Sequence, residues 1–193
     1  LSLVSIWFSQ NREVNNYRRT GYITDSRKLH IDIGNVIKDT NDDAAKIADY
    51  LINQRSCFLL AHKPLFYICR EGALKMKEIG YIHAEAYTLN ALRHGPYALI
   101  EKGTPVIIAG NAETIDECNN IIEEVKLRGA YVITITNTIN ISQYVDIAIN
   151  VPQNLTYGAL LINVVFQLIS YNMAIKKGIN PDKPRNLAKC VTV

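Results

Sequence analysis

The apolar run Cys57-Phe58-Leu59-Leu60-Ala61, followed by a helical stretch at 66–80, indicates how the rest of the chain folds. A short continuous run of this kind is typical of a strand buried on both faces of a parallel sheet. Similar runs lie at 104–109, 131–135 and 147–151, and 82–86 is a candidate for one further strand.

Helical stretches at 66–80, 112–128 and 158–177 alternate with these strands. Strands that alternate with helices predict the α/β class, here a three-layer α/β/α sandwich with a parallel sheet.

The residues before the first strand are predicted to be linker helices. An opening helix carries Leu3, Ile6, Trp7 and Phe8 near one face. Gly21 is expected to end it, after which Asp25-Ser26 and Asn41-Asp42-Asp43 each resemble the N-terminal cap of a further helix. These helices carry no obvious chemistry.

Composition excludes several classes of protein. The 193 residues are 48% hydrophobic and 20% charged, which suits one globular domain with a helical appendage. Lys and Arg number 21 against 18 Asp and Glu, and a net charge of +3 predicts no nucleic-acid partner. The apolar residues 1–8 are too few to span a bilayer, so no membrane partner is expected. Because the chain starts at Leu1 without Met, we expect a piece of a longer protein.

Cysteine usage and missing motifs narrow the chemistry further. Cys57, Cys69, Cys118 and Cys190 show no CxxC spacing, so zinc-knuckle and thioredoxin sites are not predicted. Scattered thiols and no export signal predict reduced cysteines and a cytoplasmic location. The loop Ala61-His62-Lys63-Pro64 lacks the glycines of a dinucleotide cradle. We therefore expect neither a cofactor nor a metal.

Three ionisable residues share one stripe of the helix at 66–80. At 100° per residue, Glu71, Lys75 and Glu78 lie within about 60° of one another. Phe66, Cys69, Ala73 and Met76 fall on the opposite side, which should pack on the sheet. The spacing alone is compatible with two surface ion pairs, or with a proton-transfer carboxylate tuned by a neighbouring ammonium.

Two further groups could take part in proton or amine chemistry. His94 lies in Leu92-Arg93-His94-Gly95-Pro96, where Gly-Pro forces a turn, so it is either a capping or core group or a proton carrier. Lys189 lies in a tail that is either solvated or folded over a site. His62 follows the first strand at the edge where α/β proteins bind ligands, whereas His83 is expected to be structural.

Three long motifs carry a resemblance to a known family. Residues 71–87, with Glu71-Gly72-Ala73-Leu74-Lys75 at their start, resemble the second sugar-isomerase (SIS) domain of the glutamine:fructose-6-phosphate amidotransferases, also called glucosamine-6-phosphate synthases. Arg93-His94-Gly95-Pro96 followed by Ala98-Leu99-Ile100 is similar to the K-H-G-P-x-A-L-I block of that family. Residues 182–193 are similar to its closing D-x-P-R-N-L-A-K-S-V-T-V-E block.

The resemblance implies a flavodoxin-like fold and an aldose–ketose isomerisation. Fructose 6-phosphate and ammonia from a separate glutaminase domain would become glucosamine 6-phosphate. By motif match, Glu78 moves the proton between C1 and C2, and His94 is the ring-opening acid/base of the neighbouring subunit's site. Lys189 is the Schiff-base amine, and Lys75 is a nearby positioning charge. Ala188, Lys189 and Glu78 would contact the substrate.

The resemblance also implies how the chain is divided. Residues 1–55 would be the helical linker from a first SIS domain, 56–178 the second SIS domain, and 179–193 an active-site tail. The partners would be the first SIS domain, the glutaminase domain and a second copy in a homodimer. The family's phosphate-binding Ser/Thr loops belong to the first SIS domain, so we expect this chain alone to be inactive.

The sequence departs from the family's motifs in places, and two rival functions stay open. Ala61-His62-Lys63 stands where the family usually has Gly-Arg-Gly, and Cys190 stands where it has Ser. One rival is a non-catalytic SIS module that only binds a sugar phosphate as a regulator. The other is an inert half-domain.

Overall fold

The computed structural model describes residues 1–12 and 15–187 and contains one parallel five-stranded sheet. The strands are β1 (Ser56–Ala61), β2 (His83–Thr88), β3 (Pro105–Gly110), β4 (Tyr131–Thr136) and β5 (Ile147–Asn150), in the order β2-β1-β3-β4-β5. All four pairings are parallel, so the predicted sheet, including its fifth strand, is confirmed.

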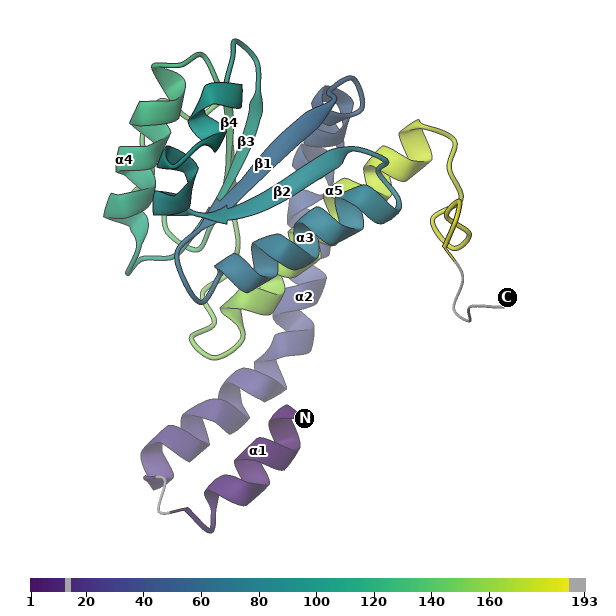
Figure 1. The fold of residues 1–193 in the computed structure, drawn as a ribbon. Coiled ribbons are helices and arrows are strands. Elements are labelled where there is room, and N and C mark those ends of the chain that lie inside the picture. The colour runs from purple at the N-terminus through teal and green to yellow at the C-terminus, as the bar shows by residue number, and fades with distance from the viewer. Residues whose placement is uncertain (13–14, 188–193) are drawn as a thin grey trace.

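Helices cover both faces of the sheet and make the three predicted layers (Figure 1). On one face lie α2 (Asn16–Leu51), α3 (Phe66–Glu78) and α5 (Gly158–Lys176). On the other lie α4 (Ile115–Lys126) and the 3₁₀ helices η1 (Leu89–Arg93) and η2 (Pro96–Leu99). Each face has its own apolar core, because successive residues of a buried strand point to opposite faces.

The alternation of side chains along β1 shows this division. Cys57, Leu59 and Ala61 pack towards α2, α3 and α5, whereas Phe58 and Leu60 pack towards α4. The sheet is buried on both faces at its centre. Its edge strand β5 is not: Ala148 and Asn150 are exposed, so the prediction of burial on both faces is wrong for this strand.

The N-terminal helices differ from the prediction. A short helix, α1 (Ser2–Ser9), is followed by the single 36-residue helix α2, so neither Gly21 nor the two predicted caps interrupts it. Gly21 is exposed with open space around it, and a glycine inside a helix costs only about 1 kcal/mol. Burial of Val36, Ile47 and Leu51 outweighs that cost, at about 1.5–3 kcal/mol for each large side chain.

Two acidic residues of α2, one of them Asp25 from the first predicted cap, contact the loop before another helix. Asp25 Oδ2 accepts hydrogen bonds from the backbone N–H and the hydroxyl of Thr156, and Asp32 accepts one from Asn154 Nδ2 at 3.0 Å. Both partners lie in the loop before α5. The two carboxylates therefore fix α5 against α2, and Asp25 does not start a new helix.

Helix α5 lies in the middle of the helical layer, against both α2 and α3. An 18-residue stretch of this 19-residue helix has a mean hydropathy of 1.6, so by length and composition alone the helix could span a membrane. Its buried side chains, Phe166 and Ile169 among them, belong to the core between the helices and the sheet. A core helix of a soluble protein passes the same test of length and hydropathy.

Candidate active site

Helix α3 brings Glu71, Lys75 and Glu78 together on the side away from the sheet. Its opposite side buries Cys69, Ala73 and Met76, as the spacing predicts. Lys75 Nζ lies 2.7 Å from Glu78 Oε2 and 3.4 Å from Glu71 Oε1. The three side chains are half-buried, so one ammonium is held between two carboxylates at the surface.

This arrangement keeps Lys75 charged. The hydrogen bond to Glu78 raises the pKa of Lys75 above its ordinary value, against an opposing effect of burial, and the charges of Glu78 and Glu71 add to the increase. The same charged hydrogen bond fixes the position of one oxygen of the Glu78 carboxylate.

Glu78 lines a cavity of about 530 Å³ between the end of α3, the start of β2 and the C-terminal segment. Leu74, Lys77, Tyr81, Ile82 and His83 form one side of the cavity, and Arg185, Asn186 and Leu187 form the other. Glu71 is not among the lining residues; it borders a separate cavity beside the edge of β2.

The C-terminal segment is held at this cavity by Tyr81. The backbone N–H of Arg185 donates to the Tyr81 hydroxyl at 2.7 Å, and the Arg185 guanidinium lies 4.3 Å over the centre of the Tyr81 ring. Lys177 Nζ donates to the carbonyl of Gly80 at 2.6 Å, which ties the end of α5 to the same turn. Neither Tyr81 nor Arg185 is among the sequence-predicted site residues, although both lie inside the family-like motifs.

The tail residues predicted to act on the substrate, Ala188 and Lys189, lie outside the described residues. The described chain ends at Leu187, in the wall of the Glu78 cavity. Their predicted roles therefore stay predictions.

His94 does not join this group within the chain. It lies in the turn between η1 and η2, which follow the C-terminal end of β2, whereas Glu78 precedes the N-terminal end of that strand. A strand of six residues spans about 20 Å, so the two ends are well separated. His94 is exposed, and Gly95, with φ 134°, provides the backbone conformation for the turn that follows it.

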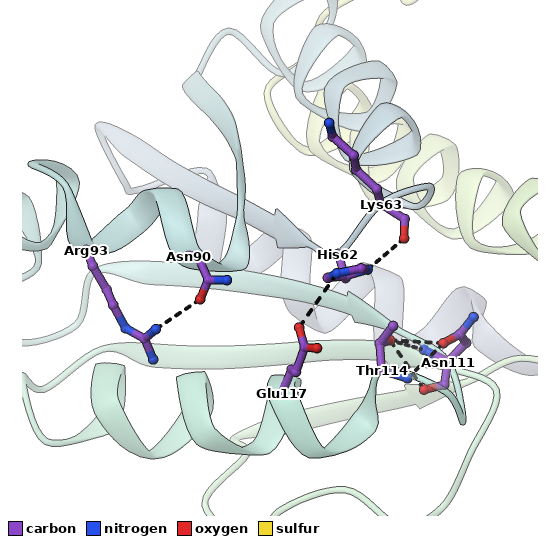
Figure 2. Close-up of polar contacts among 7 residues, drawn as sticks. All are labelled: His62, Lys63, Asn90, Arg93, Asn111, Thr114 and Glu117. Atoms are coloured by element: carbon purple, nitrogen blue, oxygen red, sulfur yellow. Dashed lines mark hydrogen bonds and ion pairs between the residues drawn. The ribbon is translucent and has the colours of Figure 1, made fainter.

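His62 lies at the carboxyl edge of the sheet, as predicted (Figure 2). It follows the end of β1, whereas Glu78 precedes the start of the parallel strand β2. Its Nε2 is 3.8 Å from Glu117 Oε2, and its Nδ1 is 2.7 Å from the carbonyl of Lys63. At the same edge Asn111 and Thr114 exchange hydrogen bonds between side chain and backbone, at 3.1 and 3.2 Å. Asn111 and Thr114 thus bind each other in the loop that precedes α4.

Other side chains are less suited to catalysis. Cys57, Cys69 and Cys118 are free and buried, and burial raises the pKa of Cys57 to about 12 and that of Cys118 to about 11. Such thiols stay protonated and are poor nucleophiles. In the part of the chain that the structure describes, no cluster of three His, Cys, Asp or Glu could hold a metal ion.

Comparison with known proteins agrees with the fold. The family model described as "SIS domain" matches residues 50–177. The chain is 36% identical over 194 residues to a protein of Acanthamoeba polyphaga mimivirus named "Probable glutamine--fructose-6-phosphate aminotransferase [isomerizing]", covering 100% of this chain and 32% of that protein. It is 40% identical over 176 residues to the glutamine–fructose-6-phosphate aminotransferase of Methanosarcina acetivorans, covering 89% of this chain and 28% of that protein.

Among solved structures, the C-terminal domain of glucosamine-fructose-6-phosphate aminotransferase from Francisella tularensis superposes with a TM-score of 0.78. The two are 28% identical, and the match covers 86% of this chain and 48% of that one. The chain thus spans about a third of the length of the curated relatives it matches.

Proposed function

The chain belongs to the SIS domain family, and from this premise we propose that it is the C-terminal part of the isomerase domain of a glucosamine-6-phosphate synthase. In this proposal a longer protein converts fructose 6-phosphate and glutamine-derived ammonia to glucosamine 6-phosphate. This chain supplies the proton-transfer carboxylate and the tail amine, and a first SIS domain supplies the phosphate pocket.

One observation carries the proposal. Glu78, with the Lys75 ammonium on one of its oxygens, lines the same cavity as Arg185 and Leu187, and Leu187 is two residues before the tail lysine in sequence. An isomerisation through an iminium needs a proton-transfer base and an amine, and Lys189 is proposed to be that amine. A surface ion pair with only a structural role would not require a cavity or a tail beside it.

The proposed chemistry uses each residue once. His94 of the partner subunit opens the sugar ring by proton transfer. Lys189 condenses with the ketone at C2 and water leaves. Ammonia then adds to C2 of this iminium and displaces the Lys189 amine, and the resulting sugar iminium makes the C1 hydrogens acidic. Glu78 removes one C1 proton and returns it to C2, which a single base on one side of the sugar can do. Lys75 stays protonated and holds Glu78 in place.

The test is whether the longer protein exchanges sugar hydrogens with solvent. We expect it to incorporate deuterium at the sugar carbon during turnover of fructose 6-phosphate in heavy water, whereas the isolated 193-residue chain should not. A non-catalytic sugar-phosphate module would bind the sugar without any exchange. That result for the longer protein would refute the proposal, and turnover by the isolated chain would refute its division between two SIS domains.

A further inference from the structure

The turn that carries His94 is attached to helix α4 through one carboxylate, Glu124. Arg93, directly before the histidine, donates from Nε to Glu124 Oε2 at 3.1 Å and from Nη2 to Glu124 Oε1. Tyr97, three residues after it, donates its hydroxyl to the same Oε2. Both flanks of His94 therefore converge on a single side chain that is 31 residues from Arg93 and 27 from Tyr97.

Two further contacts complete the cluster. Arg93 also donates to Asn90 Oδ1 at 2.9 Å, within η1 (Figure 2), and the Arg128 guanidinium lies 4.1 Å over the Tyr97 ring. A bidentate pair between a guanidinium and a carboxylate fixes orientation as well as distance. The cluster thus restrains the turn on both sides of His94 against a helix of the domain.

The histidine itself is not restrained by its own side chain. No hydrogen bond or ion pair between described residues involves the His94 imidazole, and its backbone N–H donates to the carbonyl of Ala91 at 3.1 Å. Gly95 follows it in a backbone conformation that few other residues adopt. The contacts of Arg93 and Tyr97 with Glu124 therefore restrain the position of His94.

We propose that Glu124 is a positioning residue for His94: it binds Arg93 and Tyr97 and so holds the turn that presents the imidazole outward to a second copy of the chain. The inference rests on the proposed function, because it assigns Glu124 a part in the step that His94 performs. Glu124 touches no substrate and acts only through the turn.

The first measurement needs no activity. In the 193-residue chain, Glu124→Gln loses the charged pair but keeps the side-chain shape, and Glu123→Gln on the same helix is the matched control, since Glu123 is exposed and outside the cluster. We expect faster hydrogen–deuterium exchange of amides 89–99 in the Glu124 variant only, with exchange in β1, β3 and β4 unchanged. Equal exchange in both variants would overturn the proposal.

The second measurement separates positioning from a general structural effect. In the longer protein, Glu124→Gln should lower kcat by on the order of 10- to 100-fold, because small displacements of catalytic groups carry penalties of that size. KM and the melting temperature should stay close to those of the Glu123→Gln control. In a His94→Gln background the same substitution should have no further effect, since there is no imidazole left to position.

Each outcome has a distinct meaning. An equal loss of kcat from Glu124→Gln with and without His94 would show a structural effect and overturn the inference, while the proposed function would stand. A His94→Gln protein with wild-type kcat would instead remove His94 from the proposed function, and the role of Glu124 with it. Tyr97→Phe, which removes a single hydroxyl, should give a smaller loss of kcat. It keeps the proposal testable if the Glu124 variant misfolds.

Discussion

At the scale of single residues, Glu71 and Glu78 share one ammonium but stand in different surroundings. Glu78 is closer to Lys75, at 2.7 Å against 3.4 Å, and it alone borders the cavity that the C-terminal segment lines. The helical stripe cannot distinguish these two carboxylates, because both lie on the same side of α3. The cavity supports the same choice as the family motif, which assigns the proton transfer to Glu78.

We predict that Glu78→Gln abolishes isomerisation in the longer protein and leaves sugar-phosphate binding intact. The amide keeps the shape and a hydrogen bond to Lys75 but cannot accept the proton, and loss of a general base costs about 10²–10⁴ in rate. Exchange of the sugar hydrogens with solvent and calorimetric binding of fructose 6-phosphate measure the two effects separately.

The matched variant is Glu71→Gln, which removes the second carboxylate that pairs with Lys75. It should lower the pKa of Lys75 slightly and leave exchange of the sugar hydrogens within a few-fold of wild type. Loss of exchange in Glu71→Gln with normal exchange in Glu78→Gln would reverse the assignment.

The sequence predicts part of this site and not the rest, for a physical reason. The stripe and both ion pairs follow from helical spacing, which is local. The cavity depends on Tyr81 holding Arg185 across 104 residues of chain, and no local pattern encodes that contact. The separation of His94 from Glu78 depends on the direction of β2 and its place in the sheet, which are properties of the fold.

At the scale of elements, the strands and the helices around them are predictable because apolar runs between turn residues are strong signals. The long helix α2 is mispredicted because Gly and Asx residues weaken a helix only slightly, whereas packing against α5 stabilises it strongly. There is no proline before Pro64, so nothing in residues 16–51 prevents one continuous helix.

The contact between α3 and α5 offers a test of packing. A Cβ on Gly72 would lie 2.6 Å from the Phe166 ring, so Gly72→Ala should force the helices apart and lower the free energy of unfolding by about 1–3 kcal/mol. Gly34→Ala in α2 is the control, because nothing lies within 4 Å and alanine favours a helix by up to about 1 kcal/mol. Urea unfolding of the two variants should give opposite signs, and equal stabilisation would contradict the close approach of α3 to α5.

The cluster around Glu124 contributes to the stability of the fold over a defined pH range. Burial, and then the hydrogen bond to Glu124, raise the pKa of Tyr97 from 10.0 to about 12. The unfolded chain therefore loses this proton before the folded one, so the contribution of Tyr97 to stability is complete below pH 10 and is lost as the pH rises towards about 12. The hydrogen bond from Arg93 lowers the pKa of Glu124, so its contribution is complete above 4.5 and is lost as the pH falls through the lowered value.

Alkaline titration tests this prediction. The difference in tyrosinate absorbance between the wild-type chain and Tyr97→Phe should rise near pH 12 and not near pH 10. The same titration in the Glu124→Gln chain should move that rise to lower pH, because the acceptor is then an uncharged amide. A Tyr97 transition at the ordinary value in the wild-type chain would contradict the buried, hydrogen-bonded hydroxyl.

At the scale of the whole molecule, the two proposed proton-transfer residues lie beyond opposite ends of β2. One chain cannot bring both to one sugar without unfolding that strand. Two copies related by a two-fold axis can, because each copy then gives its exposed His94 turn to the Glu78 cavity of the other. The need for a second copy thus follows from the topology of the sheet together with the proposed chemistry.

Mixed dimers of the longer protein test this arrangement. Glu78→Gln and His94→Gln proteins should each keep only a small residual activity, but co-expression should restore about a quarter of the wild-type activity, because half of the randomly formed dimers are mixed and each mixed dimer has one site with both residues intact. Light scattering at high micromolar concentration should give the mass of a dimer. Co-expression of two Glu78→Gln copies carrying different tags is the control and should restore nothing. If mixed dimers form but stay inactive, Glu78 and His94 act in the same chain and the proposed exchange of His94 between copies is wrong. The chain would then need a large rearrangement, because the two residues lie beyond opposite ends of β2.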